Sequence, residues 1–422
     1  MTASPAPLRS AEIIAVGSEL LGSARIDTNS LFLADGLASL GIALRAKTVV
    51  GDRRGDLETI FRLALERVDL VILTGGLGPT DDDLTRDAVA KVLDLPLTED
   101  AAIVADIESR FAKRGLRMPA INRRQAMVPR GATVLDNPNG SAPGLLIYVG
   151  DRVVVLLPGP PREMKPMFER VAASVLSARA GRERFYRLTI LVAGRSESHV
   201  EEAVQPIYAP LATAVPPIET TILAAPGQIE VHLTARSDDA ELATRALTSA
   251  RDRIVAAIGD DAFSLDGRSM EEIVGSLLLG ASSTIAVAES CSGGLLLSRL
   301  TDVPGSSAYV RGGVVAYSNE VKTAFADVPA ALIVEHGAVS EPVARAMAEG
   351  IRARMQSTIG VGVTGIAGPG GGSPAKPVGT VAIAVAAPSG TTVRTVRFNG
   401  NRAQIKHYAS QSALDMVRRL LI

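Results

Sequence analysis

Short apolar runs alternate with helical patterns of apolar residues, and this alternation constrains the fold of the chain more than any other feature. In the first 170 residues the strand-like runs lie at 12–16, 43–50, 69–74 and 151–157, and the helical patterns lie at 28–40, 56–66 and from Thr85 onward. Strands that alternate with helices predict βαβ units around a parallel sheet. The N-terminal part of the chain is therefore predicted to be an α/β domain.

The pattern changes twice further along the chain. Residues 171–265 combine three strand-like runs with a short and a long helical pattern, which indicates a small α+β unit. Alternation returns after that, with strands expected at 284–288, 312–317, 359–364, 380–386 and 392–398. Ser340 is expected to cap a helix that has Pro342 in its first turn. Because domains usually contain roughly 100–200 residues, we expect three domains, at 1–170, 171–265 and 266–422.

Charge and composition exclude several classes of function. The net charge of −1 gives no broad basic field, so binding to bulk nucleic acid or to a membrane surface is not expected. The single cysteine, Cys291, allows no intrachain disulfide, which suits a reducing compartment. The first ten residues hold no long apolar run, and the apolar stretches elsewhere have only the length of strands. These features predict a cytoplasmic protein.

A glycine turn with three aspartates marks the first candidate site. Gly75, Gly76 and Gly78 follow a predicted strand, and Thr80 leads into Asp81, Asp82 and Asp83. Glycines at a strand end let backbone N–H groups approach a phosphate, and carboxylates suit a divalent cation. A plain structural turn and aspartates that only cap the helix from Thr85 remain alternatives.

Three other loops are expected at the same edge of this sheet. Glu19 follows the first predicted strand, although it could equally be a solvated residue at a helix start. The loops 137–144 and 158–161 are rich in turn-forming residues and include Asn137, Gly140 and Gly159. Loops at the carboxyl ends of parallel strands converge on one crevice, so these segments are predicted to line one site.

Ser290 is the candidate nucleophile of the C-terminal part. It lies where a strand is predicted to turn into a helix, and N–H groups at the start of that helix could hold an oxyanion. A serine needs a base, and no histidine is near in sequence, whereas Lys322 follows the next predicted strand together with Tyr317. A helix-capping serine and a solvated lysine remain the simpler alternative.

Cys291 is a competing nucleophile, but a lone cysteine beside a strand end is more often a small buried side chain. Ser292 could instead orient a substrate or cap the helix. The glycine-rich loop 365–372 suits contact with a phosphate or ribose, which is a weak signal by itself.

These motifs, taken in order, resemble the CinA family (competence/damage-inducible protein A). The resemblance rests on TGGLGPTDDD at 74–83, AESCSGG at 288–294, YSNEVK at 317–322, GAVSE at 337–341 and TGIAGP at 364–369. It implies an N-terminal three-layer domain of the molybdopterin-binding type, a KH-type α+β middle domain and a C-terminal α/β deamidase domain. Residues 171–265 contain no Gly-x-x-Gly loop of the kind that clamps RNA. A structural or dimer-forming role is therefore expected for the middle domain.

For the C-terminal domain the resemblance implies conversion of nicotinamide mononucleotide to nicotinic acid mononucleotide and ammonia, without a cofactor. Ser290 would be the nucleophile and Lys322 its base, assisted by Tyr317. The expected substrate contacts are Ser292, Gly293, Gly294, Asn319, Gly365, Ile366, Ala367 and Gly368.

For the N-terminal domain the resemblance implies hydrolysis of ADP-ribose to AMP and ribose 5-phosphate with Mg²⁺, Mn²⁺ or Co²⁺. The expected metal ligands are Glu19, Asp81, Asp82 and Asp83, and the expected substrate contacts are Gly75, Gly76, Gly78, Thr80, Asn137, Gly140 and Gly159. The resemblance also implies a homodimer. Two alternatives remain open, namely a nucleotide-binding scaffold without turnover and an enzyme with only the deamidase activity.

Overall fold

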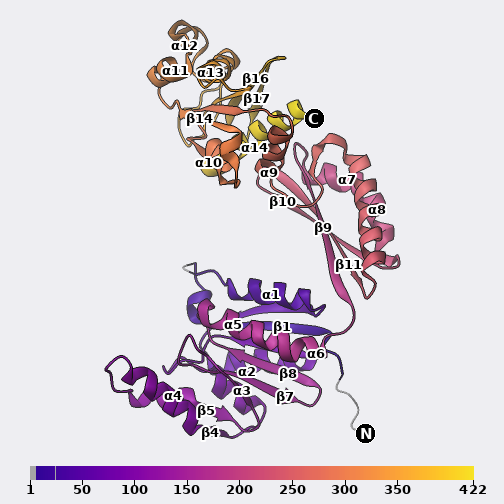
Figure 1. Ribbon diagram of the computed structural model, residues 1–422, viewed down its shortest axis with the longest axis vertical. Helices are drawn as coiled ribbons and strands as arrows, with labels where there is room; N and C mark the ends of the chain where they lie inside the picture. The colour runs from indigo at the N-terminus through magenta and orange to yellow at the C-terminus, as the bar shows by residue number, and fades with distance from the viewer. Residues whose placement is uncertain (1–5, 24) are drawn as a thin grey trace. The chain divides into compact units, whose positions relative to one another are not determined.

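The computed structural model describes residues 6–23 and 25–422 (Figure 1). The chain divides into two compact units. The first runs to Tyr186 and also includes Arg236–Leu242, and the second contains Arg187–Ala235 and Ala243–Ile422. The expected middle segment is thus divided, and most of it belongs to the same unit as the C-terminal segment.

The first unit is built on a mostly parallel sheet in the order β2-β1-β3-β8-β7-β6. Its strands are β1 (Ser10–Val16), β2 (Ala43–Val50), β3 (Leu70–Thr74), β6 (Thr133–Leu135), β7 (Gly144–Val149) and β8 (Arg152–Leu157). The neighbouring strands β2, β1, β3 and β8 are parallel, as the alternation predicts, whereas β7 and β6 add an antiparallel edge.

Helices cover both faces of this sheet, which gives the expected three layers. Ile13 packs toward α1 (Asn29–Ser39) and α5 (Pro161–Val171), and its neighbour Ile14 packs toward α2 (Arg54–Arg67) and α3 (Thr85–Val92). Successive side chains of a strand point to opposite faces, so a strand covered on both faces is apolar throughout.

The segment between α3 and β6 contains elements that the periodicity does not predict. They are β4 (Leu97–Glu99), α4 (Ala101–Ala112), the short helix Ala120–Ala126 and β5 (Met127–Pro129). Asp100 caps α4, because its Oδ1 accepts hydrogen bonds from the N–H groups of Ala102 and Ile103. After α5, helical structure continues to Arg179, past the expected domain boundary at residue 170.

The middle of the chain forms a four-stranded sheet in the order β10-β11-β9-β12, most of which belongs to the second unit. Its strands are β9 (Arg184–Val192), β10 (Ile218–Ala225), β11 (Gln228–Ser237) and β12 (Ala262–Ser264), and its helices are α7 (Glu197–Tyr208) and α8 (Ala240–Ile258). This is the small α+β arrangement that the sequence predicts for the middle of the chain.

The C-terminal part is a second three-layer α/β arrangement, with the sheet order β14-β13-β15-β16-β17. The strands are β13 (Ile285–Glu289), β14 (Val310–Val315), β15 (Ile359–Gly365), β16 (Thr380–Ala387) and β17 (Gly390–Arg397). The neighbours β14, β13 and β15 are parallel, while β16 and β17 are antiparallel.

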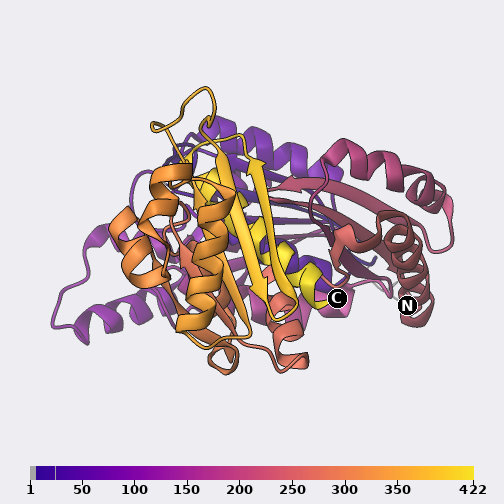
Figure 2. The same cartoon turned by 90° about the horizontal axis from the view of Figure 1, so that it is seen from above.

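Helices α9 (Met270–Gly280), α10 (Leu295–Asp302) and α14 (Arg402–Leu421) cover one face of this sheet. Helices α11 (Asn319–Ala326), α12 (Ala330–His336) and α13 (Glu341–Arg354) cover the other (Figure 2). Ser340 precedes α13 as expected, but its hydroxyl donates to the Gly337 carbonyl and makes no capping bond. No helix in the described ranges is long and apolar enough to cross a membrane.

Candidate active sites

The C-terminal candidate site lies at the carboxyl ends of three neighbouring parallel strands. The register pairs Glu289 at the end of β13 with Val315 of β14 and with Val363 of β15. Ser290 follows β13 directly, and its N–H donates to the Val363 carbonyl at 2.8 Å. Residues that are far apart in sequence are therefore brought to one edge of the sheet.

Ser290 and Lys322 meet at this edge, as the sequence predicts. Lys322 lies on α11, and its Nζ is 3.2 Å from Ser290 Oγ, 3.0 Å from the Ala316 carbonyl oxygen and 3.3 Å from the Tyr317 carbonyl oxygen. The two side chains are buried, with exposed fractions of 8% for Ser290 and 2% for Lys322. The solvated lysine of the simpler alternative is therefore not what the structure shows.

The surroundings of Lys322 favour its neutral form. Burial lowers the pKa of its ammonium group, although Cys291 and Glu320 act in the opposite direction. A neutral amine has two N–H bonds and one lone pair. The carbonyl oxygens of Ala316 and Tyr317 can accept hydrogen bonds from those two N–H groups. The lone pair of the amine is then free to accept the hydroxyl proton of Ser290.

The expected oxyanion donors at the start of α10 are already occupied. The buried carboxylate of Glu289 accepts hydrogen bonds from the N–H groups of Gly294 at 3.1 Å, Leu296 at 3.0 Å and Leu297 at 2.8 Å. The expectation that these amides face a substrate is wrong, because the last residue of β13 reaches over the turn and caps the helix. Among the described residues, the N–H groups of Cys291 and Ser292 donate to no backbone oxygen, and both interact with the Cys291 sulfur.

The two residues after Ser290 are both buried. Burial raises the pKa of the Cys291 thiol to about 12, which disfavours the thiolate that a nucleophile requires. Ser292 is fully buried, and its Oγ has no hydrogen-bond partner among the described residues. Its hydroxyl therefore has unused hydrogen-bonding capacity beside Ser290.

Helix α14 brings two cations to this region that sequence reasoning did not single out. Arg402 donates to the Tyr317 hydroxyl at 2.7 Å and to the Gly368 carbonyl at 2.7 Å. A Cβ added to Gly293 would lie 3.4 Å from Lys406 Nζ, so the amine of Lys406 lies over that glycine. The sequence shows these two basic residues four positions apart on the last helix. However, no feature near them in the sequence indicates that this helix lies close to Ser290.

The other predicted contacts differ in their placement. Tyr317 is 60% exposed, and its hydroxyl contacts Arg402 rather than Ser290. Asn319 is exposed at the start of α11. A Cβ on Gly365 would lie 2.9 Å from Cys291 Sγ, so this glycine borders the Ser290 turn, whereas Ala367 packs into the core beneath α14.

The N-terminal candidate site is a cavity of about 390 Å³ at the carboxyl ends of β1, β3 and β8. The predicted residues that line it are Glu19, Gly75, Gly76, Gly78, Asp82, Asp83 and Gly159. Ser141, from the predicted loop 137–144, also lines it, as do Asp52 and Gln125, which the sequence did not predict. Convergence of the strand-end loops on one crevice is thus found as expected.

The glycine turn presents backbone donors to this cavity. Gly75 and Gly76 have φ values of 100° and 66°, which favour glycine, and a Cβ on Gly76 would lie 2.3 Å from Thr85 Oγ1. Among the described residues, the N–H groups of Gly76, Leu77 and Gly78 have no acceptor. Successive free N–H groups in such a turn form a concave site for an anion.

The three adjacent aspartates do not act as one cluster. Asp83 accepts from the N–H of Thr80 at 2.9 Å and from its hydroxyl at 2.6 Å, so Thr80 and Asp83 brace the turn. Asp81 is 99% exposed, pairs with Arg124 at 2.7 Å and does not line the cavity. The structure therefore places Asp82 and Asp83 at the cavity but not Asp81, which was expected beside them.

Asn137 and Gly140 support the cavity wall rather than line it. Asn137 Nδ2 donates to Glu163 Oε2 at 2.9 Å and to the Ala142 carbonyl at 2.7 Å. A Cβ on Gly140 would lie 1.9 Å from Glu163 Oε2. These two residues thus position Glu163, whose side chain reaches the cavity.

The lining suits a divalent cation for which the protein supplies only some of the ligands. No group of three or more His, Cys, Asp or Glu side chains converges as a metal site within residues 6–23 and 25–422. However, Glu19, Asp52, Asp82 and Asp83 border the same cavity as the free amides of the glycine turn. Mg²⁺ is usually bound by one or two carboxylates together with water and substrate phosphates, and this donor set fits that pattern.

Comparisons with known proteins agree with this division into two α/β parts. Residues 12–178 match the family model described as "Probable molybdopterin binding domain", and residues 267–421 match the model described as "CinA C-terminal domain". The chain is therefore a protein with a molybdopterin-binding-type domain followed by a CinA domain.

Relatives of this architecture match along the whole chain. A CinA-like protein of Koribacter versatilis is 48% identical over 98% of this chain and 100% of its own length, and one of Acidobacterium capsulatum is 46% identical over the same shares. A putative competence-damage inducible protein of Caldicellulosiruptor bescii is 42% identical over 98% of this chain and 99% of its own. The chain belongs to the CinA family.

Proposed function

We propose that the C-terminal site hydrolyses the carboxamide of nicotinamide mononucleotide to nicotinic acid mononucleotide and ammonia. The observation that carries this proposal is the buried contact of 3.2 Å between Lys322 Nζ and Ser290 Oγ. A serine beside a lysine that is favoured in its neutral form is suited to acyl transfer. The substrate is inferred from the resemblance of the Ser290, Lys322 and 364–369 motifs to the family pattern.

The reaction would proceed in two acyl-transfer steps. Lys322 takes the hydroxyl proton of Ser290 as Oγ attacks the carboxamide carbon, and the lysine returns that proton to the departing nitrogen, which leaves as ammonia. Water then attacks the acyl-serine, with Lys322 again accepting and returning a proton. Because Glu289 occupies the amides of α10, the N–H groups of Cys291 and Ser292 are our candidate oxyanion donors.

The test is ammonia release from nicotinamide mononucleotide by Ser290→Ala and Lys322→Ala. Loss of the nucleophile should lower kcat by several orders of magnitude. Ser298→Ala is the matched control, because Ser298 is an exposed serine on the adjacent helix α10. Wild-type rates in Ser290→Ala or Lys322→Ala would refute the assignment, and loss in Ser298→Ala would show that the assay reports folding instead.

We also propose that the N-terminal cavity hydrolyses ADP-ribose to AMP and ribose 5-phosphate. The supporting observation is that free N–H groups of the glycine turn and several carboxylates border one cavity. Gly76, Leu77 and Gly78 would donate to the pyrophosphate. Glu19 and Asp82 would hold a divalent cation, because Asp52 and Asp83 accept from backbone N–H groups of other residues, whereas Asp82 accepts only from the Thr80 hydroxyl and its own N–H. When bound, the cation would neutralise pyrophosphate charge and orient a water molecule.

Neighbouring aspartates provide the control for this second activity. Asp82→Asn should abolish most of the turnover of ADP-ribose, and Asp81→Asn should retain it, because Asp81 lies outside the cavity. Turnover that survives complete chelation would refute the cation. Ammonia release without any ADP-ribose hydrolysis would support an enzyme with the deamidase activity alone, and binding of both nucleotides without product would support a scaffold.

A further inference from the structure

A cavity in the second unit lies apart from both proposed active sites. Its volume is about 380 Å³, within the range of roughly 300–1,000 Å³ that small-molecule sites occupy. The lining comes from the turn after β9, the hairpin of β10 and β11, the end of β17 and one face of α14. None of its lining residues belongs to the N-terminal cavity or to the Ser290–Lys322 pair.

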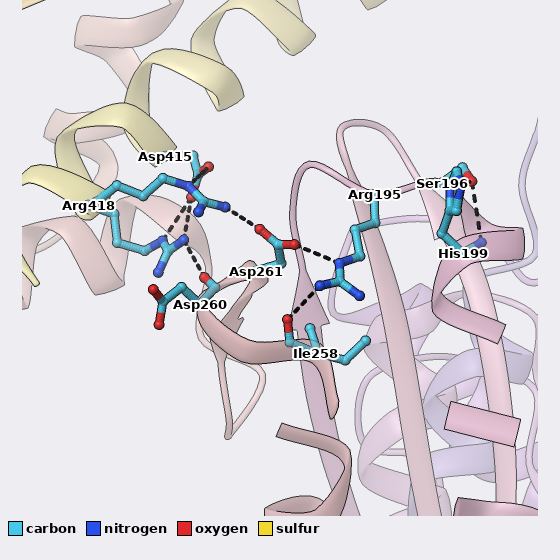
Figure 3. A network of polar contacts seen from close by, with 9 residues as sticks. Arg195, Ser196, His199, Ile258, Asp260, Asp261, Asp415 and Arg418 are labelled. Atoms are coloured by element: carbon cyan, nitrogen blue, oxygen red, sulfur yellow. Dashed lines mark hydrogen bonds and ion pairs between the residues drawn. The ribbon is translucent and has the colours of Figure 1, made fainter. Parts of the chain in front are cut away.

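A polar network holds the walls of this cavity together (Figure 3). Arg195 Nε donates to Asp261 at 2.6 Å, and its Nη2 donates to the Ile258 carbonyl at 2.8 Å. Asp261 also accepts from Arg419 of α14, which is bound in turn to Asp415 at 2.8 Å. Because these groups satisfy one another, the Asp415 and Arg195 charges in the lining are already paired.

Two further cations in the lining are not paired. Arg394 and Arg397 at the end of β17 are exposed and form no ion pair with any residue that the structure describes. Since Asp415 is the only acidic residue in the lining and is already paired, the cavity has an excess of positive charge. Guanidinium groups bind phosphate oxygens through charge-assisted, often bidentate, hydrogen bonds.

The remaining wall suits a planar ring. Phe398 and Tyr408 contact each other with their ring centroids 5.8 Å apart, and both line the cavity. Side chains alternate along a strand, so Arg394, Val396 and Phe398 lie on one face of β17. Arg397 lies on the other face with Thr391 and Thr395, whose hydroxyls bond to Glu349 and Glu341 of α13. The amide side chain of Asn399 also lines the cavity and can pair with the polar edge of a base. The amides of Gln228 and Gln411 are already bonded to each other, to Glu230 and to Arg299.

We propose that this cavity binds a nucleotide, with its phosphate near Arg394 and its base against Phe398 and Tyr408. Aromatic side chains accept any base by stacking, while the Arg394 guanidinium group requires an anion. The combination distinguishes a nucleotide from a free nucleoside and from an inorganic anion.

The chain contains no tryptophan, which allows a reporter specific to this cavity. In Phe398→Trp, the single indole would lie in the wall, so AMP should change its fluorescence in a saturable way. Tyr408→Trp places the reporter on α14 and serves if the first variant does not fold. Tyr148→Trp, at an exposed position in the first unit, is the control and should not respond.

Arginine variants in the reporter background test the role of the phosphate. Arg394→Ala should raise the apparent Kd for AMP by at least about tenfold, since it removes charged hydrogen-bond donors, whereas Arg397→Ala, on the other face of β17, should leave the Kd nearly unchanged. Arg311→Ala removes an exposed arginine of β14 and should leave the Kd unchanged. No response to millimolar AMP in either folded reporter would overturn the proposal. Equal responses to AMP and inorganic phosphate, or to AMP and adenosine, would also overturn it.

Discussion

The substitution Glu289→Gln should loosen the start of α10 and the turn that carries Ser290. In the native protein the two carboxylate oxygens of Glu289 serve three backbone N–H groups within 3.1 Å, and its side chain is buried. Glutamine retains one acceptor oxygen and places an N–H₂ group where the other oxygen was. That group faces N–H donors, so it cannot replace the lost acceptor.

The magnitude follows from the number of bonds lost. If the retained oxygen stays with Leu297, the N–H groups of Gly294 and Leu296 lose their acceptor. Hydrogen bonds to a charged group contribute about 1.5–3 kcal/mol each and are not fully additive, so we expect a local loss of about 2–4 kcal/mol. At 1.4 kcal/mol for each factor of ten, exchange of these amides with solvent should accelerate by about 30- to 700-fold.

Hydrogen exchange with residue resolution is the direct assay, because it reports the turn without requiring two-state unfolding of the whole chain. Glu272→Gln is a matched control, since Glu272 also caps a helix, accepts from the Ser269 N–H at 2.7 Å and is exposed. It should lose less than about 1 kcal/mol. Acceleration of the Gly294 and Leu296 amides by less than about fivefold would refute our account of Glu289.

Three other perturbations have defined outcomes. The kcat/KM for amide hydrolysis should rise with pH through the pKa of Lys322, because only the neutral amine can accept the Ser290 proton. Burial holds that pKa below its ordinary value of 10.5. A pH-independent kcat/KM would contradict this role. Cys291, with its pKa raised to about 12, should resist iodoacetamide at neutral pH, and rapid labelling seen by mass spectrometry would contradict its burial. Gly140→Ala should displace Glu163, 1.9 Å from the new Cβ, and lower ADP-ribose turnover by at least about tenfold while ammonia release is unchanged. The control Gly55→Ala, with no atom within 4 Å of its Cβ, should leave both rates unchanged.

The long elements could be predicted from sequence because their burial pattern is simple. The strands β3, β8, β13 and β15 are buried almost throughout and appear as continuous apolar runs. The strands β4, β5 and β6 have three residues each, which is too short for any periodicity to be visible. Asp100 is a helix-start signal for α4 that hydrophobic periodicity alone does not reveal.

For the candidate sites, the sequence predicts which loops converge but not where their side chains point. Strand order placed Ser290 beside Lys322 and brought the glycine turn to a cavity. Side-chain direction within a turn is set by local contacts that sequence spacing does not contain. Asp81 faces Arg124 while Asp83 folds back onto Thr80, so three consecutive carboxylates do not share one direction.

The role of Glu289 shows why a helix start could not be assigned to the substrate from sequence. The start of α10 has free amides only if no acceptor of the protein reaches them, and the last residue of β13 provides that acceptor. The negative carboxylate is stabilised there by the same amides that were expected to hold an oxyanion. What remains for the substrate is the Ser290 turn itself, with the N–H groups of Cys291 and Ser292 beside the buried hydroxyl of Ser292. If the deamidase proposal is correct, Glu289 therefore acts by fixing the position of this turn, and its substitution should lower kcat in proportion to the loosening that hydrogen exchange measures.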